Sequence, residues 1–313
     1  MSKMATREAY GKALAKYGME NENIVVLDAD LSKSTKTADF KKVCPDRFIN
    51  MGIAEGNMMA VAAGLAACGK IPFASTFAMF AAGRAFEQIR NSICYPKLNV
   101  KICATHAGIT VGEDGASHQA IEDISLMRSI PNMTIINPSD AVETEAAIKA
   151  IIEYKGPCYV RLGRSAVNII NDNADYKFEI GKGSLLREGK DATIIATGIM
   201  VDAALEAYNI LAEEGIRTRV INIHTIKPID EEIITKAARE TGVIITAEEH
   251  SIIGGLGSAV AEVVSTNYPV SVLRVGIKDV FGESGKPAEL LKAYGLTAED
   301  IVKEVKKGIA MAK

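Results

Sequence analysis

The loop from His106 to Gln119 carries side chains that could do acid–base chemistry. Its sequence, HAGITVGEDGASHQ, holds two of the four histidines, His106 and His118, together with Glu113, Asp114 and three glycines. Positioned histidines and carboxylates can transfer protons and stabilise developing charge. Because glycines weaken packing and cost backbone entropy, a polar substrate site explains this loop better than a structural role. The spacing matches no standard metal-ligand pattern, so we expect no metal site here.

Glu55 is a second candidate, because it opens a run of small residues, GNMMAVAAGLAAC. An acid in the first turn of a helix favours the helix dipole by about 0.3–1 kcal/mol, which is a sufficient structural explanation. The functional alternative is a carboxyl group in an apolar setting. Burial there would make the charged form costly and would favour sharing a proton.

Phe73, Phe77 and Phe80 form a third cluster, drawn from only eight phenylalanines in the chain. A spacing of three predicts that Phe77 and Phe80 share a helical face. Packing in the core is the ordinary explanation for such a cluster. An aromatic platform for a flat heterocycle is the functional alternative.

Two arginines could hold a phosphate. Arg7 lies near the start of the sequence and Arg164 follows a predicted strand in RLGRS, although each alone is also explained as a surface arginine. The P-loop and GxGxxG patterns are absent, so nucleotide binding is not predicted. The net charge of -3 predicts no nucleic-acid or anionic membrane partner. His224 and His250 are expected to be structural.

An α/β fold would position these residues. Apolar runs that favour strands alternate with helical patterns, which predicts mainly parallel sheets with helices on both faces. In the first half the predicted strands are 23–28, 71–76, 99–105, 133–138 and 158–163. In the second half they are 191–197, 217–223, 242–249 and 269–276. Ligands bind beyond the carboxyl ends of such strands, where the candidate residues fall.

Two consecutive domains are predicted. The alternation weakens around 165–190, where NDNADYKFEIGKGSLLREGK is polar and rich in turn residues. We therefore predict a first domain at 1–172, a linker at 173–189 and a second domain at 190–313. A chain of 313 residues, 48% hydrophobic and 24% charged, has the length and composition of a compact soluble protein with two domains.

The cysteines and the apolar runs indicate where in the cell the protein is expected. No two of the five cysteines have the short spacing of a zinc or redox motif, and most lie in apolar runs. We expect buried free thiols, as in a reducing environment. The N-terminus lacks the apolar core of a signal peptide, and the run 58–68 is shorter than the roughly 20 residues that span a bilayer. The expected location is cytoplasmic, without a membrane partner.

The sequence as a whole resembles the C-terminal half of transketolase. GIAEGNM, STFAMF, ATHAGITVGEDGASHQ and RSIPNM match blocks of that family's pyrimidine-binding domain, and EEHSIIGGLGSAVAE matches its C-terminal domain. The resemblance therefore implies a thiamine-diphosphate pyrimidine-binding fold at 1–172 and a transketolase C-terminal-like domain at 190–313.

The resemblance assigns roles to individual residues. Glu55 would bond to the N1' nitrogen of the aminopyrimidine ring of thiamine diphosphate, and Phe80, with Phe77 beside it, would form the wall against that ring. Glu55, His106 and His118 would be catalytic, since Glu55 shares a proton with the ring and the histidines move protons during ketose cleavage. The residues expected to contact sugar substrates are Arg7, Asp30, Ser34, His106, Asp114, His118 and Arg164.

The resemblance also implies a partner. Transketolase has a diphosphate-binding domain with a GDG…N motif for a divalent metal, and this sequence contains no GDG. We therefore expect a separate N-terminal subunit of about 250–300 residues to hold the diphosphate and the metal, magnesium or calcium. A homodimer of this chain within a two-plus-two assembly would be the natural closed arrangement.

The predicted activity is transfer of a two-carbon ketol unit from a ketose phosphate to an aldose phosphate, as in the pentose phosphate pathway, and only with the partner present. A beta subunit of a 2-oxo acid dehydrogenase is an alternative, because those chains are likewise separate. Deoxyxylulose-phosphate synthase is another, but THAG and His118-Gln119 favour transketolase. A non-catalytic regulatory subunit of the same fold is a third, and intact Glu55, His106, Asp114 and His118 argue against it.

Overall fold

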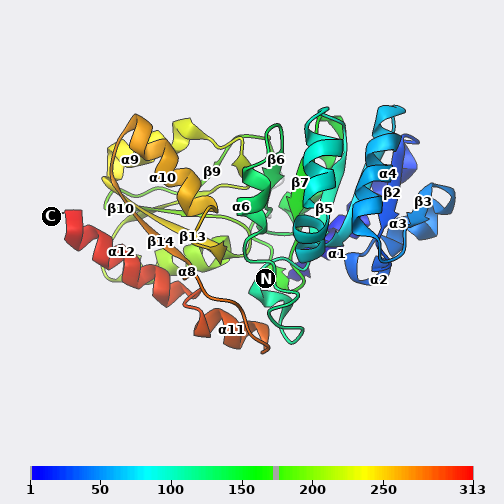
Figure 1. Cartoon of the computed structure of the whole chain (residues 1–313). Coiled ribbons are helices and arrows are strands. Elements are labelled where there is room, and N and C mark those ends of the chain that lie inside the picture. Colours follow the sequence, from blue (N-terminus) through cyan, green and yellow to red (C-terminus); the bar gives the residue numbers. More distant parts are fainter. Residues whose placement is uncertain (1, 172–175, 313) are drawn as a thin grey trace.

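Parallel pairing of the buried apolar runs builds two helix-covered sheets that lie side by side (Figure 1). The computed structural model describes residues 2–171 and 176–312. The predicted fold class, two consecutive α/β domains with mainly parallel sheets, is confirmed. The predicted boundary between residues 172 and 173 lies outside the described residues.

The first sheet has seven strands in the order β12-β6-β7-β5-β4-β2-β3. All neighbours pair in parallel except β12, which is antiparallel to β6. These strands are β2 (Ile24–Asp28), β3 (Phe48–Asn50), β4 (Ile71–Phe77), β5 (Lys101–Thr105), β6 (Thr134–Ile136), β7 (Cys158–Arg161) and β12 (Thr225–Lys227).

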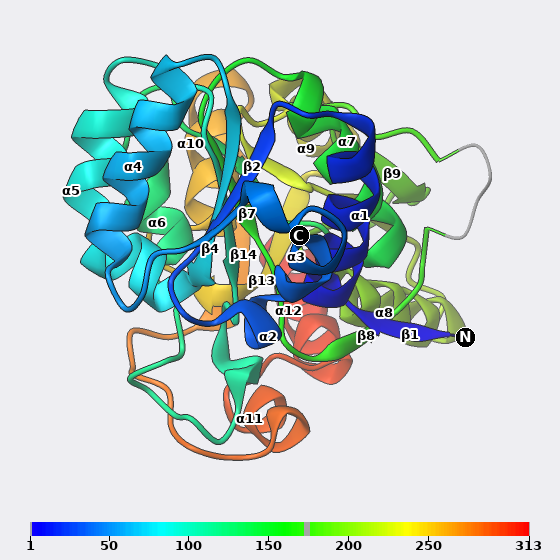
Figure 2. The same ribbon diagram turned by 90° about the vertical axis from the view of Figure 1, so that its right-hand side faces the viewer.

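Helices cover both faces of this sheet (Figure 2). On one face pack α4 (Glu55–Ala67), α5 (Phe86–Gln88) and α6 (Asp123–Arg128). On the other pack α1 (Thr6–Glu20), α3 (Ala38–Val43) and α7 (Ala141–Glu153). Asp140 caps the start of α7, because its side chain accepts a hydrogen bond from the backbone nitrogen of Glu143.

The second sheet has five strands in the order β14-β13-β10-β11-β9. They are β9 (Ser184–Arg187), β10 (Ala192–Ala196), β11 (Thr218–Asn222), β13 (Val243–Ser251) and β14 (Ser271–Ile277). One face is covered by α8 (Met200–Glu213) and α12 (Ala298–Ala312), and the other by α9 (Glu231–Thr241) and α10 (Leu256–Asn267). The edge strand β9 is antiparallel to β11 and lies within the range predicted as linker.

Shorter elements connect these layers. Strands β1 (Lys3–Ala5) and β8 (Ala166–Asn168) form a small antiparallel pair. The remaining elements are α2 (Ser32–Thr35), η1 (Pro45–Arg47), the π-helical η2 (Phe80–Arg84) and η3 (Ile89–Cys94), η4 (Ile109–Val111) and α11 (Pro287–Ala293).

The two domains share backbone hydrogen bonds. Strand β12 comes from the second half of the sequence but completes the edge of the first sheet beside β6. The backbone nitrogen of Ser251 also donates to the carbonyl of Ile121 at 2.7 Å. These bonds fix the relative position of the two sheets, which matters because loops of both domains surround the site described below.

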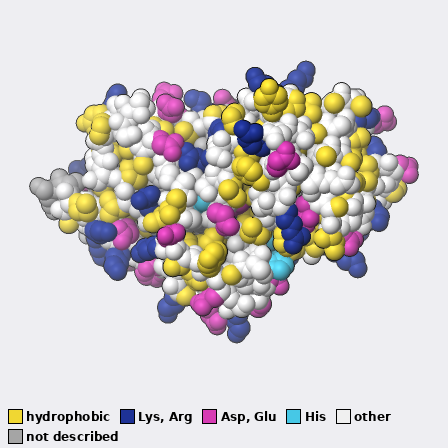
Figure 3. Space-filling model, in the orientation of Figure 1, with side chains coloured by type: hydrophobic (Ala, Val, Ile, Leu, Met, Phe, Trp, Pro, Cys, Tyr) yellow, Lys and Arg dark blue, Asp and Glu magenta, His cyan; other side chains and the backbone are white. Residues whose placement is uncertain are grey.

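Acidic and basic side chains are interspersed over the face shown in Figure 3. Within the described ranges, no helix has the length and apolar character needed to cross a membrane. Of the five free cysteines, Cys68 is exposed and the other four are buried, as their positions in apolar runs predicted for most of them.

Candidate functional site

Three of the segments that carry predicted site residues lie near the carboxyl ends of the strands in the first sheet. Phe77 is the last residue of β4, His106 directly follows β5, and Glu55 is the first residue of α4. Parallel pairing brings Phe77 level with Thr105, the neighbour of His106. This is the edge at which open α/β sheets bind their ligands.

A stack of three rings forms the centre of the site. The ring centroids of His106 and Phe77 lie 3.8 Å apart, and those of Phe77 and Phe80 lie 5.7 Å apart with planes inclined by 16°. His118 meets Phe80 edge-on at 5.4 Å. The glycine-rich loop therefore places both predicted histidines against the predicted aromatic wall.

The predicted shared helical face of the phenylalanines is wrong. Phe73 and Phe77 belong to strand β4, whereas Phe80 begins the π-helical segment η2. Phe73 is fully buried in the core beneath α1 and α7. The contact between Phe77 and Phe80 arises from a strand-to-helix turn, which spacing alone does not distinguish from a continuous helix.

Glu55 is buried, with 5% of its surface exposed, and it has a partner that the sequence analysis missed. Arg84 Nη1 donates to Glu55 Oε1 at 3.1 Å, and the guanidinium carbon of Arg84 lies 4.2 Å from the centroid of the Phe80 ring. Arg84 is 29 residues away in sequence, at the end of η2. The basic residue shortly after STFAMF was the only available signal.

His106 is held in one protonation state by its neighbours. Its Nε2 lies 3.3 Å from Arg7 Nη1, and its Nδ1 lies 2.9 Å from Thr105 Oγ1. Because arginine can only donate, Nε2 is the acceptor and Nδ1 carries the proton. Burial, with the positive charges of Arg7 and Arg164 and with His118, lowers the pKa of His106 to about 3. The side chain is therefore a neutral hydrogen-bond acceptor at pH 7.

The backbone at His106 is also unusual. Its φ of +57° lies in the left-handed region, which non-glycine residues seldom adopt. Such a conformation costs about 1–3 kcal/mol and persists where the surrounding structure imposes it. Here the strand, the Thr105 contact and the Phe77 stack all fix the imidazole in place.

Arg7 and Arg164 supply positive charge beside His106. Arg7 Nη1 donates to the carbonyl of Ser34 at 2.8 Å. Burial lowers the pKa of Arg7; nearby Glu8 opposes this shift and Arg164 adds to it. Arg164 Nη1 donates to the carbonyl of Val111 and to Glu113 Oε2. Two cations close enough to repel each other are favourably placed for an anion.

Asp28 organises the loop that carries two of the predicted residues, although the sequence analysis did not single it out. Its carboxylate accepts from Leu31 N at 2.6 Å, Thr35 Oγ1 at 2.7 Å and Thr37 Oγ1 at 2.9 Å. Burial raises the pKa of Asp28, and these hydrogen bonds oppose the rise. A charged residue at the end of the buried run NIVVLD was the signal for it.

The predicted residues Asp30, Ser34 and Asp114 stand apart from the ring stack. Asp30 is exposed and bonds to Asn50, and Ser34 contributes its backbone carbonyl to Arg7. Asp114 is exposed, and in the described part of the chain it makes no hydrogen bond or ion pair with the other predicted side chains. Their roles as substrate ligands stay predictions.

The second domain also reaches the site loop. Gln119 Nε2 donates to the carbonyl of Glu283 at 2.9 Å, and Glu249 bonds to Thr110. Burial raises the pKa of Glu249, an effect that its interactions with Arg161 and Thr110 oppose. Sequence reasoning had assigned no role to Glu249, because partners 139 residues apart leave no local pattern.

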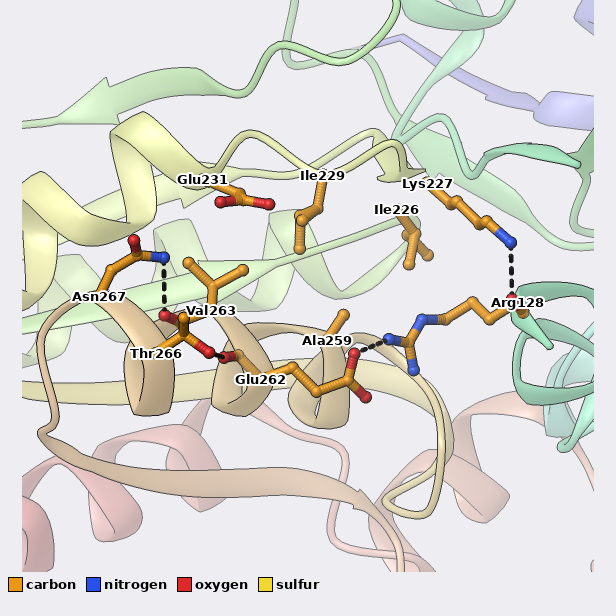
Figure 4. Close-up of a pocket in the computed structure, with 10 residues that line it drawn as sticks. All are labelled: Arg128, Ile226, Lys227, Ile229, Glu231, Ala259, Glu262, Val263, Thr266 and Asn267. Atoms are coloured by element: carbon orange, nitrogen blue, oxygen red, sulfur yellow. Dashed lines mark hydrogen bonds and ion pairs between the residues drawn. The ribbon is translucent and has the colours of Figure 1, made fainter. Parts of the chain in front are cut away.

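A cavity of about 450 Å³ lies elsewhere, at the seam between the domains (Figure 4). Arg128 reaches across it to Glu262 at 2.7 Å, and Lys227 donates to the carbonyls of Arg128 and Ile130. None of the predicted site residues lines this cavity. Arg128 and Glu262 form an ion pair across the seam, whereas Lys227 is held by backbone carbonyls.

The site residues fit the flat ring of thiamine diphosphate. A buried carboxylate beside an aromatic face suits a planar nitrogen heterocycle, and Arg84 already presents a planar donor group to both. Among residues 2–171 and 176–312, no group of three or more histidine, cysteine, aspartate or glutamate side chains is placed to hold a metal ion.

The chain matches known domains over most of its length. Residues 2–169 match the transketolase pyrimidine-binding domain, and residues 181–301 match the transketolase C-terminal domain. The chain therefore belongs to the transketolase family, which confirms the resemblance. The dehydrogenase and deoxyxylulose-phosphate-synthase alternatives are not favoured.

Individual relatives match the chain end to end. It is 58% identical over 301 residues to a putative transketolase C-terminal section from Methanocaldococcus jannaschii, covering 96% of this chain and 94% of that protein. It is 47% identical over 298 residues to 6-deoxy-6-sulfo-D-fructose transketolase subunit SqwH from Clostridium sp. (strain MSTE9), covering 95% and 92%. A solved structure described as a split gene transketolase, inactive beta4 tetramer, is 61% identical with a TM-score of 0.93 and coverages of 99% and 100%.

Proposed function

We propose that this chain is the C-terminal subunit of a two-chain, thiamine-diphosphate-dependent transketolase. It would transfer a two-carbon ketol unit from a ketose phosphate to an aldose phosphate. The observation that carries the proposal is the buried carboxylate of Glu55, which Arg84 links to the stacked rings of Phe80, Phe77 and His106. When bound, the cofactor supplies the carbanion chemistry that carries the two-carbon unit.

The chain's own residues would bind, orient and exchange protons. Glu55 would share a proton with the pyrimidine nitrogen. Neutral His106 would accept a hydrogen bond from a substrate hydroxyl through Nε2, once Arg7 turns to the phosphate. His118, edge-on to Phe80, would exchange protons on the other side of the ring stack.

The sugar phosphate would lie against Arg7 and Arg164. Arg7 Nη1 lies 3.3 Å from His106 Nε2, and burial together with the positive charges of Arg7 and Arg164 lowers the pKa of His106, so both arginines lie near that end of the ring stack. Their mutual repulsion would be relieved by a dianionic phosphate. Asp30, Ser34 and Asp114 would contact the sugars from the surrounding loops.

A separate N-terminal subunit would hold the diphosphate and the divalent metal. Relatives of the same length carry names that describe a C-terminal section or a subunit, and one relative is described as an inactive beta4 tetramer. These descriptions support a chain that assembles with itself and gains activity from a companion. We place two copies of each chain in the active assembly, and place it in the cytoplasm because the buried thiols are free.

Co-purification tests the proposal directly. This chain and a companion that carries the GDG…N motif should be inactive separately and should transfer a ketol unit when combined with thiamine diphosphate and magnesium. Turnover by this chain alone would contradict the need for a partner. A stable complex of the two chains that binds the cofactor but does not transfer a ketol unit would contradict the transketolase activity itself.

A further inference from the structure

Arg84 makes the two contacts that the pyrimidine ring of the cofactor would need. Its Nη1 donates to Glu55 Oε1 at 3.1 Å, and its guanidinium carbon lies 4.2 Å from the centroid of Phe80. A guanidinium group is flat, delocalised and rich in N–H donors. It therefore resembles a protonated aminopyrimidine in shape and in the donor that it offers to a carboxylate.

The local backbone brings Arg84 to this position. Segment η2 is π-helical from Phe80 to Arg84, and a π-helical turn holds one residue more than an α-helical turn. Arg84 thus follows Phe80 at the end of a single wide turn and folds back over the ring. Such turns often occur at functional sites.

The two partners differ in how firmly they are held. The side chain of Glu55 is 6% exposed, whereas that of Arg84 is 54% exposed. A buried carboxylate without a partner is costly, so Arg84 stabilises the protein before the cofactor arrives. Because Arg84 is largely in solvent, it can leave at a modest cost.

The guanidinium group and a flat ring cannot both lie on the same part of Phe80 and both donate a hydrogen bond to Glu55 Oε1. Phe77 already stacks on Phe80, and His118 meets the edge of that ring. The contact that Arg84 makes is thus the one that a second flat group would have to take over.

We propose that Arg84 is a positioning residue that occupies the pyrimidine subsite in place of the cofactor ring and is displaced when the ring binds. This inference rests on the proposed function, because it takes Glu55 and Phe80 as the ring's partners. Arg84 would keep the carboxylate hydrogen-bonded in the cofactor-free chain and would set the affinity for the ring by competing with it.

The test uses the full chain and a ring fragment, 4-amino-5-hydroxymethyl-2-methylpyrimidine, titrated by NMR. Arg84→Met keeps an unbranched stem and removes the guanidinium. It should tighten fragment binding by about threefold to tenfold, the fold-change expected from losing one ion pair whose arginine is exposed and one cation–π contact. Arg90→Met is the matched control, since Arg90 is exposed and, among the described residues, its side chain bonds only to neighbouring Asn91. It should leave the affinity unchanged.

A second readout follows the guanidinium itself. In the wild-type chain, the side-chain Nε–Hε signal of Arg84 should move toward that of a free arginine as the fragment binds. Weaker or unchanged binding by Arg84→Met, with binding still lost in Glu55→Gln, would overturn the inference and leave the proposed pyrimidine site standing. Absence of binding in both the wild type and Arg84→Met would reject that site, and the inference with it.

Discussion

Glu249 Oε1 accepts a hydrogen bond at 2.7 Å from the backbone nitrogen of Thr110, which lies 139 residues earlier and in the other domain. The carbonyl of Glu249 in turn accepts from Arg161 Nη2 at 2.9 Å. The loop between His106 and His118 is therefore anchored by the second domain. This anchoring gives the C-terminal domain a positioning role at a site whose predicted catalytic side chains all come from the first domain.

Gly108 makes this contact possible, and Gly108→Ala should disrupt it. A Cβ at Gly108 would lie 2.2 Å from Glu249 Cδ, and the residue has φ +78°. The clash adds to the backbone strain, so the free energy of unfolding should fall by about 2–4 kcal/mol, measured by urea denaturation. Gly69→Ala is the control, because Gly69 has φ +85° with nothing within 4 Å of its Cβ position.

The strain of a positive φ is common to both variants, so only the clash separates them. Combining Gly108→Ala with Glu249→Ala should recover part of the loss, because the shorter side chain leaves room for the methyl group. Equal losses of unfolding free energy for Gly108→Ala and Gly69→Ala would show that Glu249 does not clash with the methyl group added at position 108.

Glu55→Gln should leave folding and assembly intact while lowering turnover of the two-chain enzyme by about 10²-fold or more. Glutamine can still accept the hydrogen bond from Arg84, so the thermal midpoint should barely move. It cannot share a carboxyl proton with the cofactor ring. Glu87→Gln, at an exposed acid on α5, should keep full turnover. Wild-type turnover in Glu55→Gln would remove Glu55 from the mechanism.

Much of the fold could be predicted because its signals are local. The buried strands, the helix after Asp140 and the small-residue helix after Glu55 each depend on residues within one segment. Strands β9 and β12 were missed, because each is short and pairs antiparallel at the edge of a sheet. Nothing in TIK indicates that residues 225–227 join the first sheet rather than the second.

The candidate site, like the fold, could be predicted from the sequence only in part. His106, His118, Phe77 and Phe80 come together as the motifs suggested, because the ends of adjacent parallel strands meet. Arg84 and Glu249 were missed because their partners, Glu55 and Thr110, are distant in sequence. Both contacts depend on tertiary packing, which the periodicity of the sequence does not report.

Arg164→Ala should weaken phosphorylated acceptors more than unphosphorylated ones. A charge-assisted contact contributes about 1.5–3 kcal/mol, so kcat/KM for an aldose phosphate should fall by roughly 10-fold to 150-fold. The value for the matching unphosphorylated aldose should change little. Arg164→Lys retains the positive charge and should lose less. Equal losses for both acceptors would mean that Arg164 acts only through its contacts with Val111 and Glu113 in the loop.

The pKa of His106 predicts a pH dependence of stability. It is lowered from 6.5 to about 3 by burial, by Arg7 and Arg164, and by His118. Between these values the unfolded chain binds a proton that the native chain does not. The contribution of His106 to the free energy of unfolding is therefore present above pH 6.5 and is lost as the pH falls toward 3.

His106→Asn removes the titrating group, and asparagine tolerates the left-handed φ. Its free energy of unfolding should fall less than that of the wild type between about pH 7.5 and about pH 5, measured by urea denaturation. Burial also lowers the pKa values of His224 and His250, but both residues are present in both proteins, so the difference isolates His106. Identical losses would show that His106 has the same pKa in the native and the unfolded chain.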